Sequence, residues 1–296
     1  MQRDLGELWR FVLRRPIEPE ELAATETRLE AGMSYASLLQ ELANSEEYEH
    51  FRRLEDGVAW SLAQRKAGER PRNLEAPPGI DERPIEIPWC LSRVRPGERV
   101  LDVGYAFAEP TYLDGLRTLG DVTGVDLVLA DVPGVRSVQA DLRDLPFEEE
   151  EFDVAIAIST LEHVGRDNTQ YGLGSEEADT LDAALRELRR VAKRVLVTVP
   201  TGERELLAEQ SVYEPSEWVD RFNRAGYLIF EDELYELGAY GWRSVPELTP
   251  GTRYGTRGPG ASAVLCAELH PRTVGERVRL ALRDRRHPDD VRRVTG

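Results

Sequence analysis

The middle of the chain carries a glycine and two aspartates whose types and spacing suit a nucleoside site. Gly104, Asp126 and Asp141 each follow or end a short apolar run. Gly104 can form a tight turn whose backbone N–H groups hold an anion, here a carboxylate. Asp126 can accept hydrogen bonds from both hydroxyls of a ribose, while Asp141 and Leu142 can bracket an adenine ring. Ligands bind beyond the carboxyl ends of strands in open α/β sheets, so these positions predict a nucleoside site there.

The pattern around these positions predicts alternating strands and helices. Short apolar runs of the kind that form buried parallel strands alternate with segments of helical spacing. We expect strands at 99–104, 121–126, 135–141, 152–158, 194–200, 227–230 and 261–269, and helices at 110–120, 179–191 and 215–225. This alternation predicts an α/β fold with a doubly wound, mostly parallel seven-stranded sheet.

Four segments are expected along the chain. Residues 1–67 have helical spacing and predict a small all-α N-terminal domain, and residues 68–84 have the Pro- and Gly-rich composition of a linker. The α/β domain then covers residues 85–270. Residues 271–296 form a basic tail, either solvated or a helix that touches an acidic face or a membrane surface. No candidate catalytic group precedes the α/β domain, so the N-terminal domain is expected to be separable from the chemistry.

The composition is that of a soluble globular protein. Of 296 residues, 41% are hydrophobic and 31% are charged, and no stretch reaches the roughly 20 apolar residues that cross a bilayer. The formal net charge of −17 argues against a nucleic-acid partner, because binding to phosphates requires a basic surface.

Cys90 and Cys266 lie in separate apolar runs, so no disulfide scaffold is expected. The N-terminus lacks the apolar core of a signal peptide, and the expected location is cytoplasmic. A homo-oligomer is left open.

Four motifs in this order resemble those of class I S-adenosylmethionine-dependent methyltransferases, over residues 83–270. They are Val100-Leu-Asp-Val-Gly104, Thr123-Gly-Val-Asp126, Ala140-Asp-Leu-Arg-Asp-Leu-Pro-Phe147 and the segment 152–165. The resemblance implies that S-adenosylmethionine is the cofactor. It also implies that Gly104 holds the methionine portion, that Asp126 binds the ribose and that Asp141 contacts the adenine beside Leu142.

Three further residues of these motifs are assigned to cofactor binding: Asp102, Ala106 and Ser159. One departure from the family concerns the turn, because the usual Gly-x-Gly-x-Gly is reduced to Gly104-Tyr-Ala-Phe-Ala108. Ala106 is expected to fit, since a methyl group is small and ordinary backbone angles tolerate it. A positive φ at either alanine would weaken cofactor binding.

A narrower resemblance points to the acceptor. The segments Glu82-Arg-Pro-Ile-Glu-Ile-Pro-Trp89 and Ser159-Thr-Leu-Glu-His-Val-Gly165, with Tyr171-Gly172, resemble a methyltransferase branch linked to bacterial cell-surface polysaccharides. The N-terminal segment 8–16 is similar to a helical domain of bacterial cell-surface and glycan-processing proteins. Together they imply O-methylation of a sugar, glycan or sugar-nucleotide hydroxyl.

His163 and Glu162 are the candidate catalytic residues. A hydroxyl acceptor needs a base in reach, and His163 follows the fourth strand, where acceptor and methyl group should meet. Glu162 could orient His163 or bind cofactor groups. The alternative for His163 is a structural hydrogen bond to a loop carbonyl. No metal is expected, because the acidic run 148–151 is more simply a solvated turn.

Two other functions stay open. The eroded glycine motif favours a catalytically silent scaffold, in which the helical domain recruits a partner for glycan assembly. An NAD(P)-dependent oxidoreductase would share the sheet and the acid after the second strand. That class normally keeps Gly-x-Gly-x-x-Gly, which is absent here.

Overall fold

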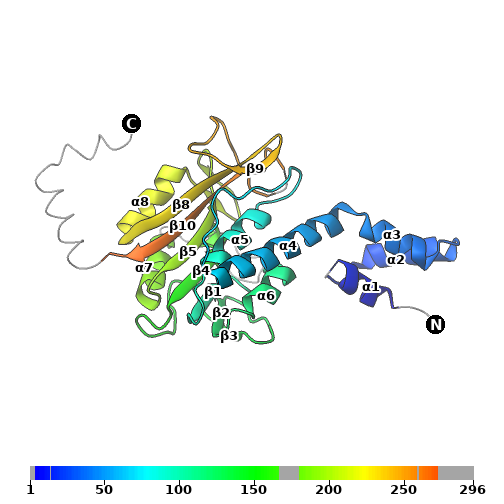
Figure 1. The fold of residues 1–296 in the computed structure, drawn as a ribbon, viewed down its shortest axis with the longest axis horizontal. Helices are drawn as coiled ribbons and strands as arrows, with labels where there is room; N and C mark the ends of the chain where they lie inside the picture. The colour runs from blue at the N-terminus through cyan, green and yellow to red at the C-terminus, as the bar shows by residue number, and fades with distance from the viewer. Residues whose placement is uncertain (1–3, 14, 167–179, 259, 273–296) are drawn as a thin grey trace, which may run out of the picture.

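The computed structural model describes residues 4–13, 15–166, 180–258 and 260–272, and a large sheet lies at its centre (Figure 1). In the described residues the sheet has eight strands, in the order β3-β2-β1-β4-β5-β10-β8-β9. Five of them, β3, β2, β1, β4 and β5, run parallel to one another. The bounds are β1 Val100–Val103, β2 Val122–Asp126, β3 Arg136–Gln139, β4 Val154–Ile158, β5 Val195–Pro200, β8 Tyr227–Gly238, β9 Gly241–Ser244 and β10 Ala263–Pro271.

The predicted doubly wound, mostly parallel sheet is confirmed, with one strand more than expected. β10 is antiparallel to both β5 and β8, and β9 is antiparallel to β8. The extra strand arises because β8 continues to Gly238 and turns back at Gly241, whose φ is +107°. The short strands β6 (Glu205–Leu206) and β7 (Ser211–Val212) form a separate hairpin.

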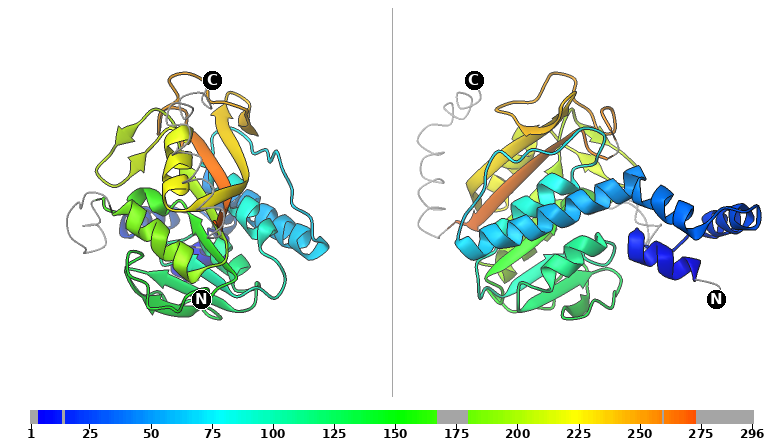
Figure 2. Two further views of the ribbon diagram at one scale, coloured as in Figure 1. Left: turned by 90° about the vertical axis from the view of Figure 1, so that its left-hand side faces the viewer. Right: turned by 45° about the vertical axis from the view of Figure 1, so that its right-hand side comes forward.

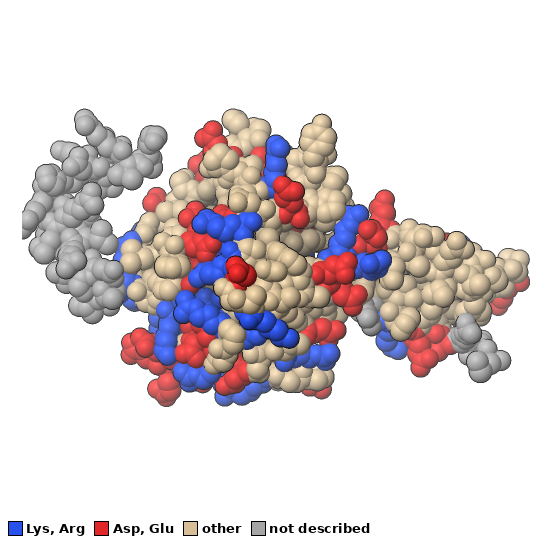
Figure 3. Space-filling model, in the orientation of Figure 1, with Lys and Arg blue, Asp and Glu red and all other residues tan. Residues whose placement is uncertain are grey.

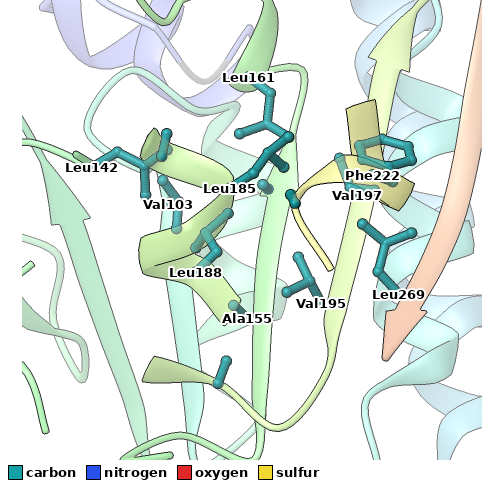
Figure 4. Packing of buried hydrophobic residues seen from close by; sticks show 14 of the residues in the cluster. Val103, Leu142, Ala155, Leu161, Leu185, Leu188, Val195, Val197, Phe222 and Leu269 are labelled. Atoms are coloured by element: carbon teal, nitrogen blue, oxygen red, sulfur yellow. The ribbon is translucent and has the colours of Figure 1, made fainter. Parts of the chain in front are cut away.

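Helices cover both faces of the sheet because successive strand residues point to opposite sides. Leu101 and Val103 of β1 belong to a core cluster with helices α7 (Leu181–Val191) and α8 (Pro215–Arg224), part of which Figure 4 shows. Val100 belongs to the opposite cluster, with α5 (Arg83–Arg93) and α6 (Pro110–Leu116). This two-sided burial explains why the central parallel strands β1, β4 and β5 are apolar runs, whereas the edge strand β3 is polar and partly exposed.

The N-terminal helices join the sheet domain through one long helix. α1 (Leu5–Val12), α2 (Pro19–Glu30) and α3 (Tyr35–Ala43) surround a small cluster of their own. The helix α4 (Glu46–Ala67) starts there and runs along the α/β part, so that α1–α3 project beyond it (Figure 2). Leu54 and Val58 in its second half are buried in the α5–α6 cluster. α4 therefore takes part in both cores.

Two truncations are expected to differ because α4 is shared. A chain beginning at Ser45 keeps Leu54 and Val58 in place, and we expect its melting temperature to stay within a few degrees of the full chain. A chain beginning at Asn73 loses both side chains, each worth about 1.5–3 kcal/mol when fully buried. We expect that chain to melt much lower in circular dichroism. Equal melting temperatures would show that α4 does not stabilise the sheet domain.

The Pro- and Gly-rich segment before α5 is held against the last strands. Leu74 donates its backbone N–H to Tyr235, and Ala76 forms an isolated bridge with Trp242. Arg93 lies over the Trp89 ring at 3.8 Å and pairs with Glu231 at 2.8 Å.

Figure 3 shows basic and acidic side chains interspersed on this side of the molecule. The basic tail lies outside the described residues from residue 273 onward, as do Tyr171 and Gly172.

Candidate functional site

The carboxyl ends of β1 to β4 border one cavity of about 530 Å³. This volume falls in the range typical of small-molecule sites. Seven of the nine residues predicted from the sequence line it: Asp102, Gly104, Asp126, Asp141, Leu142, Ser159 and His163. Ala106 and Glu162 do not line the cavity, but each lies beside a residue that does.

Gly104 forms the turn that closes the first wall of the cavity. Its φ is +82°, and its N–H donates to the carbonyl of Val125 at 2.9 Å. A Cβ atom at this position would lie 2.6 Å from Oγ1 of Thr160. Ala106 and Ala108 are not among the described non-glycine residues with positive φ. The reduced glycine motif therefore costs no backbone strain at these alanines.

Gly104→Ala is expected to destabilise the protein more than Gly97→Ala, which is its matched control. Gly97 has the same φ of +82°, and no atom lies within 4 Å of the place that its Cβ would take, so its substitution adds only backbone strain. That strain costs about 1–3 kcal/mol, whereas Gly104→Ala also forces Thr160 to move. Urea unfolding measures both changes in the free energy of unfolding. Equal losses would show that the close approach to Thr160 is not tight.

Asp126 links the first two turns of the site. One carboxylate oxygen accepts the N–H of Ala106 at 3.0 Å, and the other accepts the N–H of Leu127 at 2.7 Å. The carboxylate lines the cavity. Each oxygen has a further lone pair, because an ionised carboxylate offers about four acceptor sites. Asp126 can thus hold the backbone and bind two donors of a ligand together.

Asp102 lies on the floor of the cavity with one oxygen unpaired. The hydroxyl of Tyr112 donates to Oδ1, while Oδ2 is buried and has no hydrogen-bond partner among the described residues. Burial raises the pKa of Asp102 to about 7. A buried acceptor without a donor is unfavourable unless a ligand supplies one. The unpaired oxygen suits a cationic or N–H donor.

Asp141 is already engaged by a neighbour that the sequence motifs do not reveal. Arg143 donates to both carboxylate oxygens, at 2.9 Å from Nε and 2.6 Å from Nη2. This ion pair lowers the pKa of Asp141. Leu142 is buried and presents an apolar surface to the same part of the cavity. A ligand N–H that reaches Asp141 has to share its oxygens with Arg143.

The residues after β4 form the other end of the cavity. Ser159 has a φ of +42°, and Thr160 donates to the carbonyl of Val103, which ties β4 to β1. Nδ1 of His163 lies 2.6 Å from the carbonyl oxygen of Glu209. Because a carbonyl only accepts, Nδ1 carries the proton and Nε2 is the basic nitrogen. Burial lowers the pKa of His163, which keeps the ring neutral.

Glu162 is buried behind His163, in the short 3-10 helix Leu161–His163. Its side chain is 2% exposed, and Oε1 lies 3.9 Å from Nε2 of His163. Oε2 has no hydrogen-bond partner among the described residues. Burial raises the pKa of Glu162 well above its usual range. The contact to the imidazole is longer than a hydrogen bond, and Glu162 is not part of the cavity lining.

Helix α5 supplies cavity residues that the sequence indicates only through a resemblance. Arg83 and Ile87 line the cavity, and the buried Glu86 accepts the Ser159 hydroxyl at 2.8 Å. Pro84 in the first turn is a signal for the start of a helix, whereas Pro88 inside it is a signal against one. α5 begins at Arg83, so Pro84, the last residue of the expected linker, lies in the first turn of this helix.

The described residues contain no group of three or more His, Cys, Asp or Glu side chains that could hold a metal ion. Glu148 donates its backbone N–H to Glu151 at 2.9 Å, so the acidic run closes a turn before β4. Within the same described part of the chain, no helix is long and apolar enough to span a membrane.

Comparison with known proteins places a family domain over this site. Residues 101–195 match the family model of the methyltransferase domain. A sterol methyltransferase-like protein of Botryococcus braunii is 33% identical over 86 residues. The match covers 25% of this chain and 22% of that protein. The chain therefore spans less than a quarter of the length of this curated relative.

Several solved structures are similar to the chain at low identity. A 1,6-didemethyltoxoflavin-N1-methyltransferase of Burkholderia thailandensis, solved with S-adenosylhomocysteine, has 15% identity and a TM-score of 0.43, covering 88% of this chain and 93% of its own. An S-adenosylmethionine-dependent methyltransferase of Thermotoga maritima has 15% identity and a TM-score of 0.40, covering 76% and 95%. One from Methanosarcina mazei has 13% identity and a TM-score of 0.42, covering 59% and 92%. The acceptors of these proteins say nothing of the acceptor of this chain.

The matched segment overlaps the cavity described above. Residues 101–195, from β1 to the start of β5, form a methyltransferase domain. The cofactor of this domain is S-adenosylmethionine. Its acceptor is not given by the match.

Proposed function

We propose that the protein transfers the methyl group of S-adenosylmethionine to a hydroxyl group of a sugar, a glycan or a sugar nucleotide. One observation carries the proposal: Gly104, Asp126 and Asp102, which has one carboxylate oxygen without a partner among the described residues, line one cavity inside the matched domain. A turn, an acceptor for a cation and an acceptor for hydroxyls are the groups that an amino-acid nucleoside needs.

The residues of this wall fit the cofactor group by group. The unpaired oxygen of Asp102 suits the amino group, and Gly104 lines the cavity where the rest of the methionine portion would lie. Asp126 keeps lone pairs for two ribose hydroxyls beside its bonds to the backbone. Leu142 would lie against the adenine ring, and Asp141 would accept its amino group through an oxygen shared with Arg143.

When bound, the cofactor supplies a methyl group on a sulfonium, and the displaced product is S-adenosylhomocysteine. A sugar hydroxyl is a weak nucleophile until its proton leaves, so the chain must provide a base. His163 lines the cavity just after β4, and its Nδ1–H bond to Glu209 leaves Nε2 unprotonated. We assign the acceptor proton to Nε2. Glu162 is assigned to positioning the imidazole.

The sugar assignment rests on the polysaccharide-linked resemblance of segments 82–89 and 159–165. These two segments meet at the cavity, because the Ser159 hydroxyl donates to Glu86. The N-terminal domain, residues 1–67, is proposed to bring the enzyme to glycan-processing partners. The cytoplasm is the proposed location, which agrees with the two buried free thiols of Cys90 and Cys266.

Mass spectrometry of reaction mixtures tests the proposal. The protein is incubated with S-adenosylmethionine carrying a deuterated methyl group and with a panel of sugars and sugar nucleotides. We expect one sugar of the panel to gain the labelled methyl group in step with S-adenosylhomocysteine. The same reaction is then run with a bacterial extract in place of the panel. If the protein binds the cofactor but forms no labelled product in either mixture, the catalytically silent scaffold is favoured. Labelled methyl on nitrogen or carbon of a non-sugar acceptor would contradict the sugar assignment.

A further inference from the structure

The two halves of the cavity differ in charge. Asp102, Asp126 and Asp141 lie along the ends of β1, β2 and β3, in the half assigned to the cofactor. At the β4 end, helix α5 contributes Arg83 and Ile87 to the lining. The acceptor half therefore presents the Arg83 guanidinium, whereas the cofactor half presents these three carboxylates and one guanidinium, that of Arg143, which is paired with Asp141.

Arg83 is held in place from behind by a buried carboxylate. Its Nη1 donates to Oε2 of Glu86 at 2.8 Å, and Glu86 is fully buried. The other oxygen of Glu86 accepts the Ser159 hydroxyl at 2.8 Å, so that carboxylate is anchored on both sides. The Arg83 side chain is 29% exposed. Among the described residues, its Nε and Nη2 groups make no hydrogen bond.

The acidic residues around Arg83 are shielded from the cavity. Glu82 accepts the N–H of Ala261 at 2.9 Å and is buried, and Glu162 is buried behind His163. Neither residue lines the cavity, and neither does Glu86. Burial raises the pKa of Glu82 to about 7 and raises the pKa of Glu162 well above its usual range. A ligand at this end thus meets the guanidinium and not the carboxylates.

We propose that Arg83 binds an oxyanion of the acceptor, a carboxylate or a phosphate, through the guanidinium N–H groups that are not bonded to Glu86. This inference rests on the proposed function and narrows it to acidic or phosphorylated sugars. A guanidinium fixed on one side offers planar donors to such groups, and the geometry matches both of them. The Glu86 anchor fixes the direction of the guanidinium before the ligand arrives.

Calorimetric titration of the complex with S-adenosylhomocysteine tests this assignment. The probes are inorganic phosphate, then glucuronate and glucose 6-phosphate, each compared with glucose. We expect phosphate and at least one acidic sugar to bind, with glucose binding at least tenfold more weakly. If glucuronate is the only acidic sugar that binds, the acceptor group is a carboxylate. If glucose 6-phosphate is the only one, the acceptor group is a phosphate. No binding of any anion, or equal binding of glucose, overturns the proposal.

Variants locate the binding to Arg83. Arg83→Gln should lose at least tenfold in affinity for the anion that binds, and Arg83→Lys should keep part of it because the charge remains. Arg166→Gln is the matched control, since Arg166 lines the same cavity but donates to the carbonyl of Leu207. Wild-type affinity in Arg83→Gln, or a larger loss in Arg166→Gln, overturns the assignment. If Arg83→Gln does not fold, the assignment is tested by the affinity of Arg83→Lys and by the wild-type preference for the anions over glucose.

Titration of S-adenosylhomocysteine itself separates the two proposals. Arg83 lies outside the cofactor half, so its variants should bind S-adenosylhomocysteine within about twofold of the wild type. A wild-type protein that fails to bind S-adenosylhomocysteine contradicts the proposed function. In that case the anion titrations are run without S-adenosylhomocysteine, and they still test whether Arg83 binds the anion.

Discussion

The Asp126→Ala variant is expected to bind S-adenosylmethionine at least about 100-fold more weakly than the wild-type protein, since hydrogen bonds to a charged group contribute about 1.5–3 kcal/mol each. The carboxylate is the group assigned to both ribose hydroxyls. Calorimetric titration measures the dissociation constant directly. The cofactor-induced rise in melting temperature should fall with it, because stabilisation follows the ratio of ligand concentration to dissociation constant.

The controls for Asp126 address its bonds to the backbone. Asp126 also accepts the N–H groups of Ala106 and Leu127, so the substitution could disturb the turn. Asp126→Asn keeps one acceptor oxygen and should bind the cofactor with intermediate affinity. Asp131→Ala removes an exposed carboxylate from the nearby loop and should bind like the wild type. Wild-type affinity in Asp126→Ala would place the ribose elsewhere.

The His163→Ala variant is expected to lose about 10²–10⁴-fold in turnover, the usual contribution of a positioned base. His163 faces the acceptor end, so the affinity for S-adenosylmethionine should stay nearly unchanged. Single-turnover transfer of labelled methyl to the acceptor measures the chemical step. A normal rate, or loss of cofactor affinity with a normal rate, would show that the bond to Glu209 is the whole role of His163.

The pH dependence gives a second test of His163. A base must be neutral to accept a proton, and burial lowers the pKa of His163 from its ordinary value of 6.5. Activity should therefore be full above that value and fall as the pH drops through the lowered pKa. The His163→Ala variant should lack this limb. Glu162→Gln, which keeps the shape of the positioning side chain, should shift the limb without removing it.

The cofactor wall could be predicted from the sequence because its signals are local. The strands β1 and β2 are short, largely apolar runs that lead into Gly104 and end at Asp126, and the sheet order brings those ends together. Gly104 and Asp126 follow this pattern. The backbone at Ala106 also explains why a reduced glycine motif is compatible with the same turn.

The acceptor wall could not be predicted because its contacts join segments that are distant in sequence. Glu86 and Ser159 are 73 positions apart, and the hydrogen bond between them exists only after α5 packs on β4. The ion pair of Arg143 with Asp141 escapes prediction for another reason, since two residues this close on a loop do not reveal their geometry. The extra strand β9 depends on a turn at Gly241 beneath Ala76, a tertiary contact.

Calorimetric titration of the full chain with S-adenosylmethionine, and in parallel with NAD and NADP, tests the central claim most directly. The wall formed by Asp102, Gly104 and Asp126 predicts saturable binding of one S-adenosylmethionine per chain and no binding of either dinucleotide. Absence of binding by S-adenosylmethionine and S-adenosylhomocysteine, or tighter binding of a dinucleotide, would contradict the account.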